Sequence, residues 1–290
     1  MSVIIPCHNL GEFIDECVGS VVAQDVPNSE IIVVDDGSTD PGTLDKLSRL
    51  PVKYRNLRVI RTEHRNVSLA RNTGYAHSSG RFILFLDSDD MIGEKFIDTT
   101  MSMLEAKPEY GVAYTDIRLF GLETGTWVTG PALSPHEIYF DNYLQYCSLI
   151  RRSVIDMYGG FDPYFPSAED WEFWIKLHKN GVRFLKVPGV WARYRKRRNS
   201  KLAVNKLGLP CRINQVIVSH KDVYSRLFFR NIGTSEERNV RALIQTAAEG
   251  SHGEPITKLR RTRVYRLFIC YSIVIRAYRK VWARVMRDKI

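Results

Sequence analysis

The stretch that decides the fold reads Arg81-Phe82-Ile83-Leu84-Phe85-Leu86-Asp87-Ser88-Asp89-Asp90. An unbroken apolar run, 82–86, leads into three carboxylates, which predicts a strand buried on both faces that ends in acid. Carboxylates this close together repel one another unless a cation neutralises them. Asp87 and Asp89 offer oxygen ligands that suit Mg²⁺ or Mn²⁺ holding a diphosphate, and a solvated turn after the strand is the alternative.

Short apolar runs and amphipathic segments alternate on both sides of this stretch. The apolar runs predict strands, and the segments with apolar residues three and four positions apart predict helices. We expect strands at 2–6, 31–34, 57–61, 82–86, 111–115 and 183–187, and helices at 12–24, around 44–47, at 68–77 and at 94–104. This alternation predicts an α/β fold with a Rossmann-like, mostly parallel sheet flanked by helices.

Three of the expected strands end in polar clusters, namely His8-Asn9, Asp35-Asp36 and Asp87-Ser88-Asp89. In open parallel sheets, ligands bind outside the carboxyl ends of the strands. A purely structural sheet does not need acids at the same edge of several strands, so the coincidence predicts a binding site there. Taken alone, Asp35-Asp36 could serve only to form a turn.

Four motifs, in this order, resemble the family 2 glycosyltransferases: SVIIPCHN at 2–9, VVDDGSTD at 33–40, ARNTG at 70–74 and LDSDD at 86–90. The resemblance covers roughly residues 2–200. It implies the A-type glycosyltransferase fold, a nucleotide-diphosphosugar donor and transfer with inversion at the sugar carbon.

The resemblance also implies roles for individual side chains. Asp36 would hydrogen-bond the nucleotide base, which only an acceptor can do at the imide edge of uracil. Asp89, helped by Asp87, would hold Mn²⁺ or Mg²⁺ on the diphosphate. Arg71 would approach the nucleotide or the sugar, with a surface charge on a helix as the alternative. Asp35 would support the loop that binds the base. The nucleoside pocket would be lined by Pro6, His8 and Asn9.

A second acidic pair, Glu169-Asp170, follows a serine that can cap a helix. Both acids could therefore act only as favourable charges at the positive helix end. The pair also resembles the Glu-Asp motif of the family, which implies that Asp170 is the catalytic base and that Glu169 positions it or binds acceptor. Trp171 could stack on a sugar ring, whereas Trp174 is expected in the core.

The segment WARYRKRRNS at 191–200 departs from the family pattern. Many members carry Tyr-Arg-x-His-x-x-Ser here, and this chain has Arg197 in the register of the histidine. Arginine cannot ligate a metal, although it can clamp phosphate oxygens with two parallel hydrogen bonds. Arg195 and Arg197 are therefore candidate diphosphate contacts, and a basic surface loop is the alternative.

The composition divides the chain into a catalytic domain, 1–200, and a basic, mainly helical C-terminal extension, 201–290. From Lys258 on almost every charge is positive, and the longest uncharged run, 267–275, is too short to span a bilayer. Such a helix suits an anionic membrane surface, with docking on a protein as the alternative; no nucleic-acid-binding motif accompanies it. Five scattered cysteines and no leader favour the cytoplasm, with the protein peripheral on the membrane.

These features predict an inverting glycosyltransferase that moves a sugar, most simply from a UDP-sugar, to an acceptor hydroxyl on a glycan, a lipid-linked intermediate or a protein. A metal, Mn²⁺ or Mg²⁺, would neutralise the leaving group, and Asp170 would remove the acceptor proton. The irregular segment 119–140 is expected to form acceptor-side loops. Two alternatives are a nucleotidyltransferase, for which no Gly-rich basic loop follows the first strand, and a non-catalytic nucleotide-sugar-binding or membrane scaffold.

Overall fold

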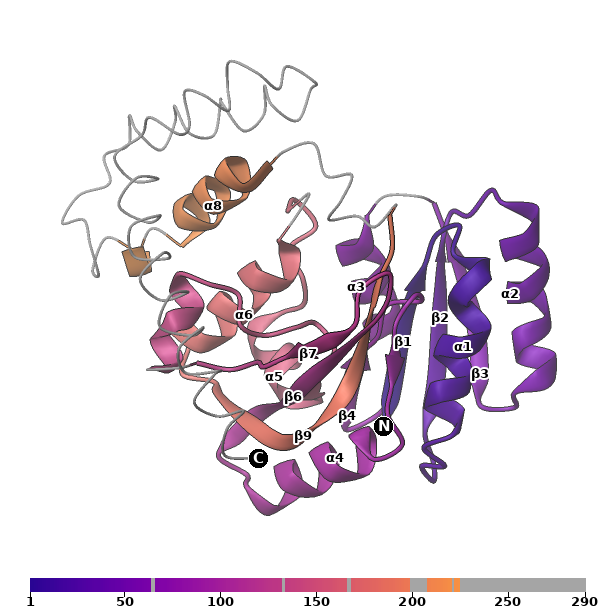
Figure 1. Ribbon diagram of the computed structural model, residues 1–290, viewed down its shortest axis with the longest axis horizontal. Coiled ribbons are helices and arrows are strands. Elements are labelled where there is room, and N and C mark those ends of the chain that lie inside the picture. The colour runs from indigo at the N-terminus through magenta and orange to yellow at the C-terminus, as the bar shows by residue number, and fades with distance from the viewer. Residues whose placement is uncertain (64–65, 132–133, 166–167, 199–207, 221, 225–290) are drawn as a thin grey trace. The chain divides into compact units, whose positions relative to one another are not determined.

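The computed structural model describes residues 1–63, 66–131, 134–165, 168–198, 208–220 and 222–224 (Figure 1). The chain divides into two compact units. The first comprises Met1–Thr129, Leu144–Phe173 and Asn180–Arg197, and the second comprises Gly130–Tyr143, Trp174–Lys179 and the chain from Arg198 on. Every candidate site residue named above lies in the first unit. The proposed boundary at residue 200 and the basic segment from Lys258 lie outside the described residues.

A mixed sheet forms the centre of the first unit, with the strand order β3-β2-β1-β4-β8-β6-β9-β5 and with β7 paired to β6. The strands are β1 (Ser2–Cys7), β2 (Glu30–Asp36), β3 (Leu57–Thr62), β4 (Phe82–Phe85), β5 (Met91–Ile92), β6 (Tyr110–Gly121), β7 (Gly125–Trp127), β8 (Leu149–Arg151) and β9 (Arg183–Lys196). The pairs β3-β2, β2-β1 and β1-β4 are parallel, which confirms the Rossmann-like half of the expected sheet.

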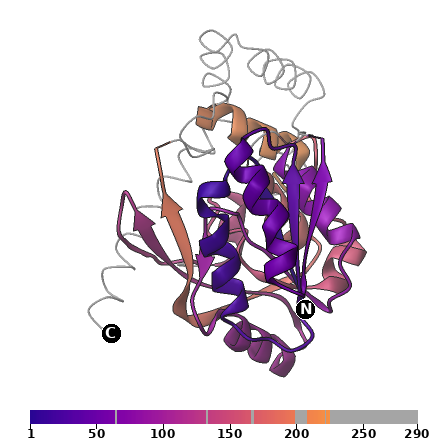
Figure 2. The ribbon, with the colours of Figure 1, turned by 90° about the vertical axis from the view of Figure 1, so that its right-hand side faces the viewer.

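The helices of the first unit flank this sheet (Figures 1 and 2). They are α1 (Gly11–Val22), α2 (Pro41–Lys53), α3 (Val67–Ala76), α4 (Phe96–Ala106), α5 (Arg152–Tyr158) and the start of α6 (Glu169–Lys179). The second unit contains the end of α6, a 3-10 helix η1 (Pro135–Tyr139) and α8 (Gly208–Ser219). No helix in the described ranges combines the length and apolar character needed to cross a membrane.

The two faces of the parallel strands explain their unbroken apolar runs. Because neighbouring side chains on a strand point to opposite faces, Val3 and Ile5 pack in one cluster with Val18 of α1, while Ile4 faces α3. On that side Gly74 lets α3 approach closely, since a Cβ there would lie 2.3 Å from Cγ2 of Ile4. Both faces of β1, β2 and β4 are covered, so polar residues in these strands occur only at their ends, whereas the edge strand β3 carries the exposed Arg58 in its interior.

Beyond β4 the sheet differs from expectation. β8 joins β4 in antiparallel orientation, and β6 and β9 both continue far past the expected strands. Part of 119–140 is therefore strand and 3-10 helix rather than loop. The short strands β5 and β8 were not expected because two or three residues carry no readable period. β5 matters for the site, because its antiparallel pairing with β9 brings the end of β9 to the acidic cluster.

Candidate functional site

The carboxyl ends of β3, β2, β1 and β4 meet at one edge of the sheet. The register places Cys7 opposite Asp35 and Asp35 opposite Arg61, and the amide of Leu86 donates to the carbonyl of Ile4. The expectation that the polar clusters after these strands gather at one edge is confirmed. The edge carries acids from two strands and a histidine from a third.

Asp35 holds the loop after β2. It is 2% exposed, its Oδ1 accepts from the amide of Ser38 at 2.8 Å, and its Oδ2 pairs with Nη1 of Arg61 at 2.5 Å. The neighbouring Asp36 is buried at 4% exposure, and its Oδ1 accepts from Thr62 at 3.3 Å. Asp35 thus forms the turn after β2, as the alternative held, and also pairs with Arg61. Asp36 accepts from Thr62 of β3 instead.

The loop after β1 contacts the loop after β2. The Oδ1 of Asn9 accepts from the amides of Thr39 and Asp40 at 2.8 and 2.9 Å, and a ring nitrogen of His8 lies 3.1 Å from the carbonyl of Asp36. Asn9 has a φ of 53°, a left-handed conformation that asparagine tolerates better than most residues. Pro6 precedes this loop in the buried strand β1. These contacts fix the predicted nucleoside-pocket residues in place.

Each carboxylate of the cluster after β4 has a cationic or hydroxyl partner. Asp87 Oδ1 lies 2.8 Å from Nη2 of Arg71, and Asp89 Oδ2 lies 2.5 Å from Nε of Arg197. Asp90, 1% exposed, accepts from Tyr146 and from the backbone amide of residue 195. Burial, together with the charge of Asp89, raises the pKa of Asp90 well above its usual range. The solvated-turn alternative does not describe this cluster.

Arg71 joins the two acidic motifs. Its side chain is 1% exposed and pairs with Asp87 and, at 3.3 Å, with Oε1 of Glu169. The guanidinium also lies 4.9 Å from the ring centroids of both Tyr146 and Phe161. Burial acts to lower the pKa of Arg71, but the carboxylates, Asp87 first, outweigh it, so the pKa is raised and the side chain stays charged. The surface-charge alternative for Arg71 is wrong.

Glu169 and Asp170 begin α6 directly after Ala168, which adopts a left-handed φ of 61°. Glu169 is buried at 7% exposure and carries the ion pair with Arg71, so it does more than cap a helix. Asp170 also contributes to the raised pKa of Arg71, so its carboxylate lies within electrostatic range of the guanidinium that pairs with Glu169. The structure therefore brings the two sequence motifs to one site.

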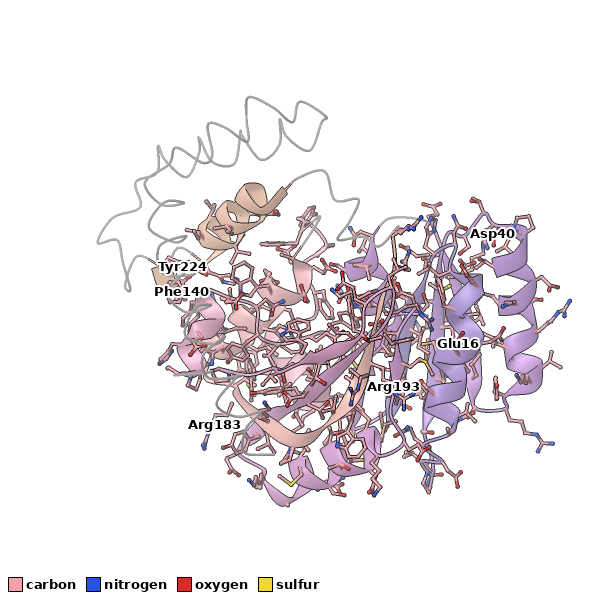
Figure 3. The ribbon with its side chains drawn as sticks, in the orientation of Figure 1. Glu16, Asp40, Phe140, Arg183, Arg193 and Tyr224 are labelled. Carbon is pink, nitrogen blue, oxygen red and sulfur yellow. The ribbon has the colours of Figure 1, made fainter. Side chains whose placement is uncertain are left out.

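Arg195 joins β9 to the acidic cluster and to α1. Its Nε donates to the carbonyl of Asp89 and its Nη2 pairs with Glu16, each at 2.8 Å. Figure 3 shows Glu16 on α1 and Arg193 on β9, the two elements that this side chain connects. The guanidinium lies 4.7 and 4.4 Å from the ring centroids of Phe13 and Phe120, respectively. Arg195 is thus part of a strand and not of a basic surface loop.

Residues 2–159, more than half of the chain, match the sequence profile of Glycosyl transferase family 2. The chain belongs to this family. Among its curated relatives, the UDP-Glc:alpha-D-GlcNAc-diphosphoundecaprenol beta-1,3-glucosyltransferase WfaP of Escherichia coli is 30% identical over 187 residues, which cover 63% of this chain and 72% of WfaP. The expected glycosyltransferase activity and family membership are both confirmed.

Solved structures support the fold of this family 2 member. TarS 1-349 of S. aureus in complex with UDP-GlcNAc has a TM-score of 0.64 at 21% identity, covering 92% of this chain and 77% of that one. The mannosyltransferase PcManGT of Pyrobaculum calidifontis in complex with GDP-Man and Mn²⁺ has a TM-score of 0.59 at 20% identity, covering 97% and 85%. At these identities the likeness confirms the α/β glycosyltransferase fold alone.

The donor set fits Mn²⁺ or Mg²⁺ poorly. No group of three or more His, Cys, Asp or Glu side chains in the described chain is placed to hold a metal. The predicted ligands Asp87 and Asp89 instead face arginines. A divalent ion bound to Asp89 would have to share that carboxylate with the Arg197 guanidinium, and the two like charges repel each other. The predicted metal stays a prediction.

Several members of the site were missed by sequence reasoning. Arg61 could have been found, because it ends the strand next to β2. Tyr146 gave no signal, since the segment before β8 has no clear period. Of the two tryptophans, Trp174 is fully buried, which confirms its core position, and Trp171 is also buried, at 6% exposure. The predicted stacking of Trp171 on a sugar stays a prediction.

Proposed function

We propose that this glycosyltransferase moves a sugar from a UDP-sugar to an acceptor hydroxyl, with inversion at the anomeric carbon and with Asp170 as the general base. The observation that carries the proposal is the Arg71 bridge, which joins Asp87 on the donor side to Glu169 beside Asp170. A site that needs a donor diphosphate and an attacking hydroxyl at one carbon requires these two motifs side by side.

The nucleotide would bind at the edge of the sheet where the carboxyl ends of the parallel strands meet. Asp36, held after β2, would accept the imide N–H of uracil, while Asp35 keeps the loop in place through Ser38 and Arg61. The name of WfaP and the ligand of the TarS structure both include a UDP-sugar, which supports this choice of donor.

The acceptor end of the site would work by proton removal. Asp170 takes the proton from the acceptor hydroxyl as its oxygen bonds to the anomeric carbon and the bond to the diphosphate breaks on the opposite face. The charge then resides on the released UDP. Arg71 keeps Glu169 oriented beside the base. We propose a lipid-linked glycan as the acceptor, since the name of WfaP contains a diphosphoundecaprenol-linked sugar; a peripheral membrane location would suit it.

The test is the substitution Asp170→Asn, assayed for UDP release from UDP-glucose with a lipid-linked N-acetylglucosamine acceptor. Turnover should fall by roughly 100- to 10,000-fold, the usual contribution of a general base, while UDP binding by calorimetry is retained. Asp98→Asn is the matched control, because Asp98 is an exposed acid in the first turn of α4 and loses the same helix-end charge.

A non-catalytic scaffold would give the opposite pattern. Wild type would bind UDP without releasing it from any UDP-sugar, and Asp170→Asn would change nothing. Full turnover in the Asp170→Asn variant would assign the base to another residue.

A further inference from the structure

Arg197 holds the position next to Asp89 that a metal ion would need. Its Nε lies 2.5 Å from Asp89 Oδ2, and the two side chains are 22% and 15% exposed. An arginine and a carboxylate this close, both largely shielded from water, form a charge-assisted hydrogen bond that is stronger than a surface ion pair. The carboxylate predicted to bind a metal is therefore already neutralised by a cation of the chain.

The neighbouring Arg195 shows that this placement is built into the fold. Met91 pairs with Arg193 in the antiparallel ladder of β5 and β9. Two residues further along β9, Arg195 therefore reaches Asp89, which lies two residues before Met91. The backbone amide of Arg195 is fixed by Asp90 at 2.7 Å. Two residues further on, Arg197 therefore reaches the cluster from an anchored strand.

An aromatic side chain supports both arginines. The guanidinium carbons of Arg195 and Arg197 lie 4.7 and 5.8 Å from the ring centroid of Phe13 on α1. The two arginines differ in their acidic partners, since Arg195 pairs with Glu16 and Arg197 with Asp89. Arg195 thus acts as a structural support, and Arg197 is the cation at the acid that the donor diphosphate would face.

We propose that the Arg197 guanidinium, rather than a divalent cation, binds the donor diphosphate and balances the charge that develops on it. This inference rests on the proposed nucleotide-sugar transfer. A guanidinium donates two parallel hydrogen bonds to phosphate oxygens and keeps its charge at every working pH. Asp89 would then act as a positioning residue that orients Arg197 instead of as a metal ligand.

The inference predicts nucleotide binding without metal. The probe is UDP, titrated by calorimetry into the full chain in EDTA and, separately, in Mn²⁺. Wild type should bind UDP in both media with affinities within about threefold of each other, whereas Arg197→Ala should bind about tenfold or more weakly in EDTA, because a charged hydrogen-bond donor is lost.

Two further variants make the test specific. Arg183→Ala removes a guanidinium from the start of β9 (Figure 3) and should leave UDP binding unchanged. There the guanidinium lies over the ring of Tyr110. Arg197→His replaces a side chain that cannot ligate a metal with one that can. Its UDP binding should become dependent on Mn²⁺.

The outcomes separate the inference from the function on which it rests. If wild type binds UDP only in Mn²⁺, the role of Arg197 is overturned and the donor site still stands. The same conclusion follows if the Arg197→Ala variant binds UDP normally in EDTA. Absence of UDP binding in both media would overturn the role of Arg197 and the UDP donor together.

Discussion

Arg71 Nη2 lies 2.8 Å from Asp87 Oδ1, and the arginine of this ion pair is 1% exposed while the carboxylate is 27% exposed. The same guanidinium contacts Glu169. One fully buried cation thus compensates acids that lie far apart in the sequence and that the proposed function places on the donor side and the acceptor side of one reaction. Loss of that cation would leave Glu169, whose side chain is 10% exposed, and the partly buried Asp87 without this charge partner.

Substitution of Arg71 by Met should destabilise the protein strongly. Removing one partner of a buried ion pair leaves an uncompensated charge and costs about 3–5 kcal/mol. The measurement is the free energy of unfolding in urea. Arg49→Met is the matched control, because Arg49 also pairs with an acid, Asp45, at 2.8 Å but is 75% exposed. That control should cost about 0.5 kcal/mol or less, so equal losses in the two variants would refute the importance of burial.

Substitution of Asp36 by Asn should change base selectivity. If the buried carboxylate accepts the imide N–H of uracil, an amide that can present its NH₂ group should weaken UDP binding by about tenfold or more. CDP should lose less, since N3 of cytosine is an acceptor. The measurement is the ratio of the UDP and CDP dissociation constants. Asp45→Asn on the exposed face of α2 is the control, and an unchanged ratio in Asp36→Asn would move the base site elsewhere.

The sequence revealed the parallel half of the fold because its signals are local. Each buried strand there is a continuous apolar run, and the run 82–86 ends where the structure places the acids. The mixed part of the sheet beyond β4 was less readable. There β6 and β9 pair in parallel, but β5 and β8, which join in antiparallel orientation, are two or three residues long and their partners are distant in sequence. Strand pairing of this kind depends on tertiary contacts that no local period records.

The residues of the candidate site were likewise predictable only in part. Asp35, Asp36 and Asp87 could be named because acids after apolar strands stand out in the sequence. Which cation each acid meets could not be read, because Arg71 and Arg197 approach from other elements and their pairing depends on the register of α3 and β9. The same patterns that predicted a metal at Asp89 did not reveal that an arginine lies 2.5 Å away.

The protein should lose stability in mild acid partly through His178, in the second unit. Burial first, and then neighbouring His136 at 3.3 Å, lowers the pKa of His178 from 6.5 to about 4. Between these two values the unfolded chain binds a proton that the folded chain does not. The contribution of His178 to stability is therefore complete above pH 6.5 and is lost as pH falls toward about 4.

Thermal unfolding at pH 7.5 and 5 tests this effect. Between pH 7.5 and pH 5 the melting temperature of His178→Gln should fall by less than that of wild type, because glutamine does not titrate. His77→Gln, which replaces an exposed histidine at the end of α3, is the matched control. A His178→Gln variant with the same pH dependence as wild type would show that the proton uptake occurs elsewhere.

Two helix glycines should respond oppositely to the same substitution. In Gly74→Ala the new methyl group would lie 2.3 Å from Cγ2 of Ile4, so α3 must move away from β1, at a cost of about 1–3 kcal/mol. In Gly19→Ala, within α1, the methyl group meets nothing within 4 Å, and the helix should gain about 0.5–1 kcal/mol. Urea unfolding measures both changes in stability.

The two substitutions should also differ in nucleotide binding. Because α3 also carries Arg71, the shift in Gly74→Ala should lengthen the contact of Arg71 with Asp87 and weaken UDP binding, whereas Gly19→Ala should bind UDP as wild type does. Stabilisation by both substitutions would mean that helix propensity outweighs the close packing of α3 on the sheet.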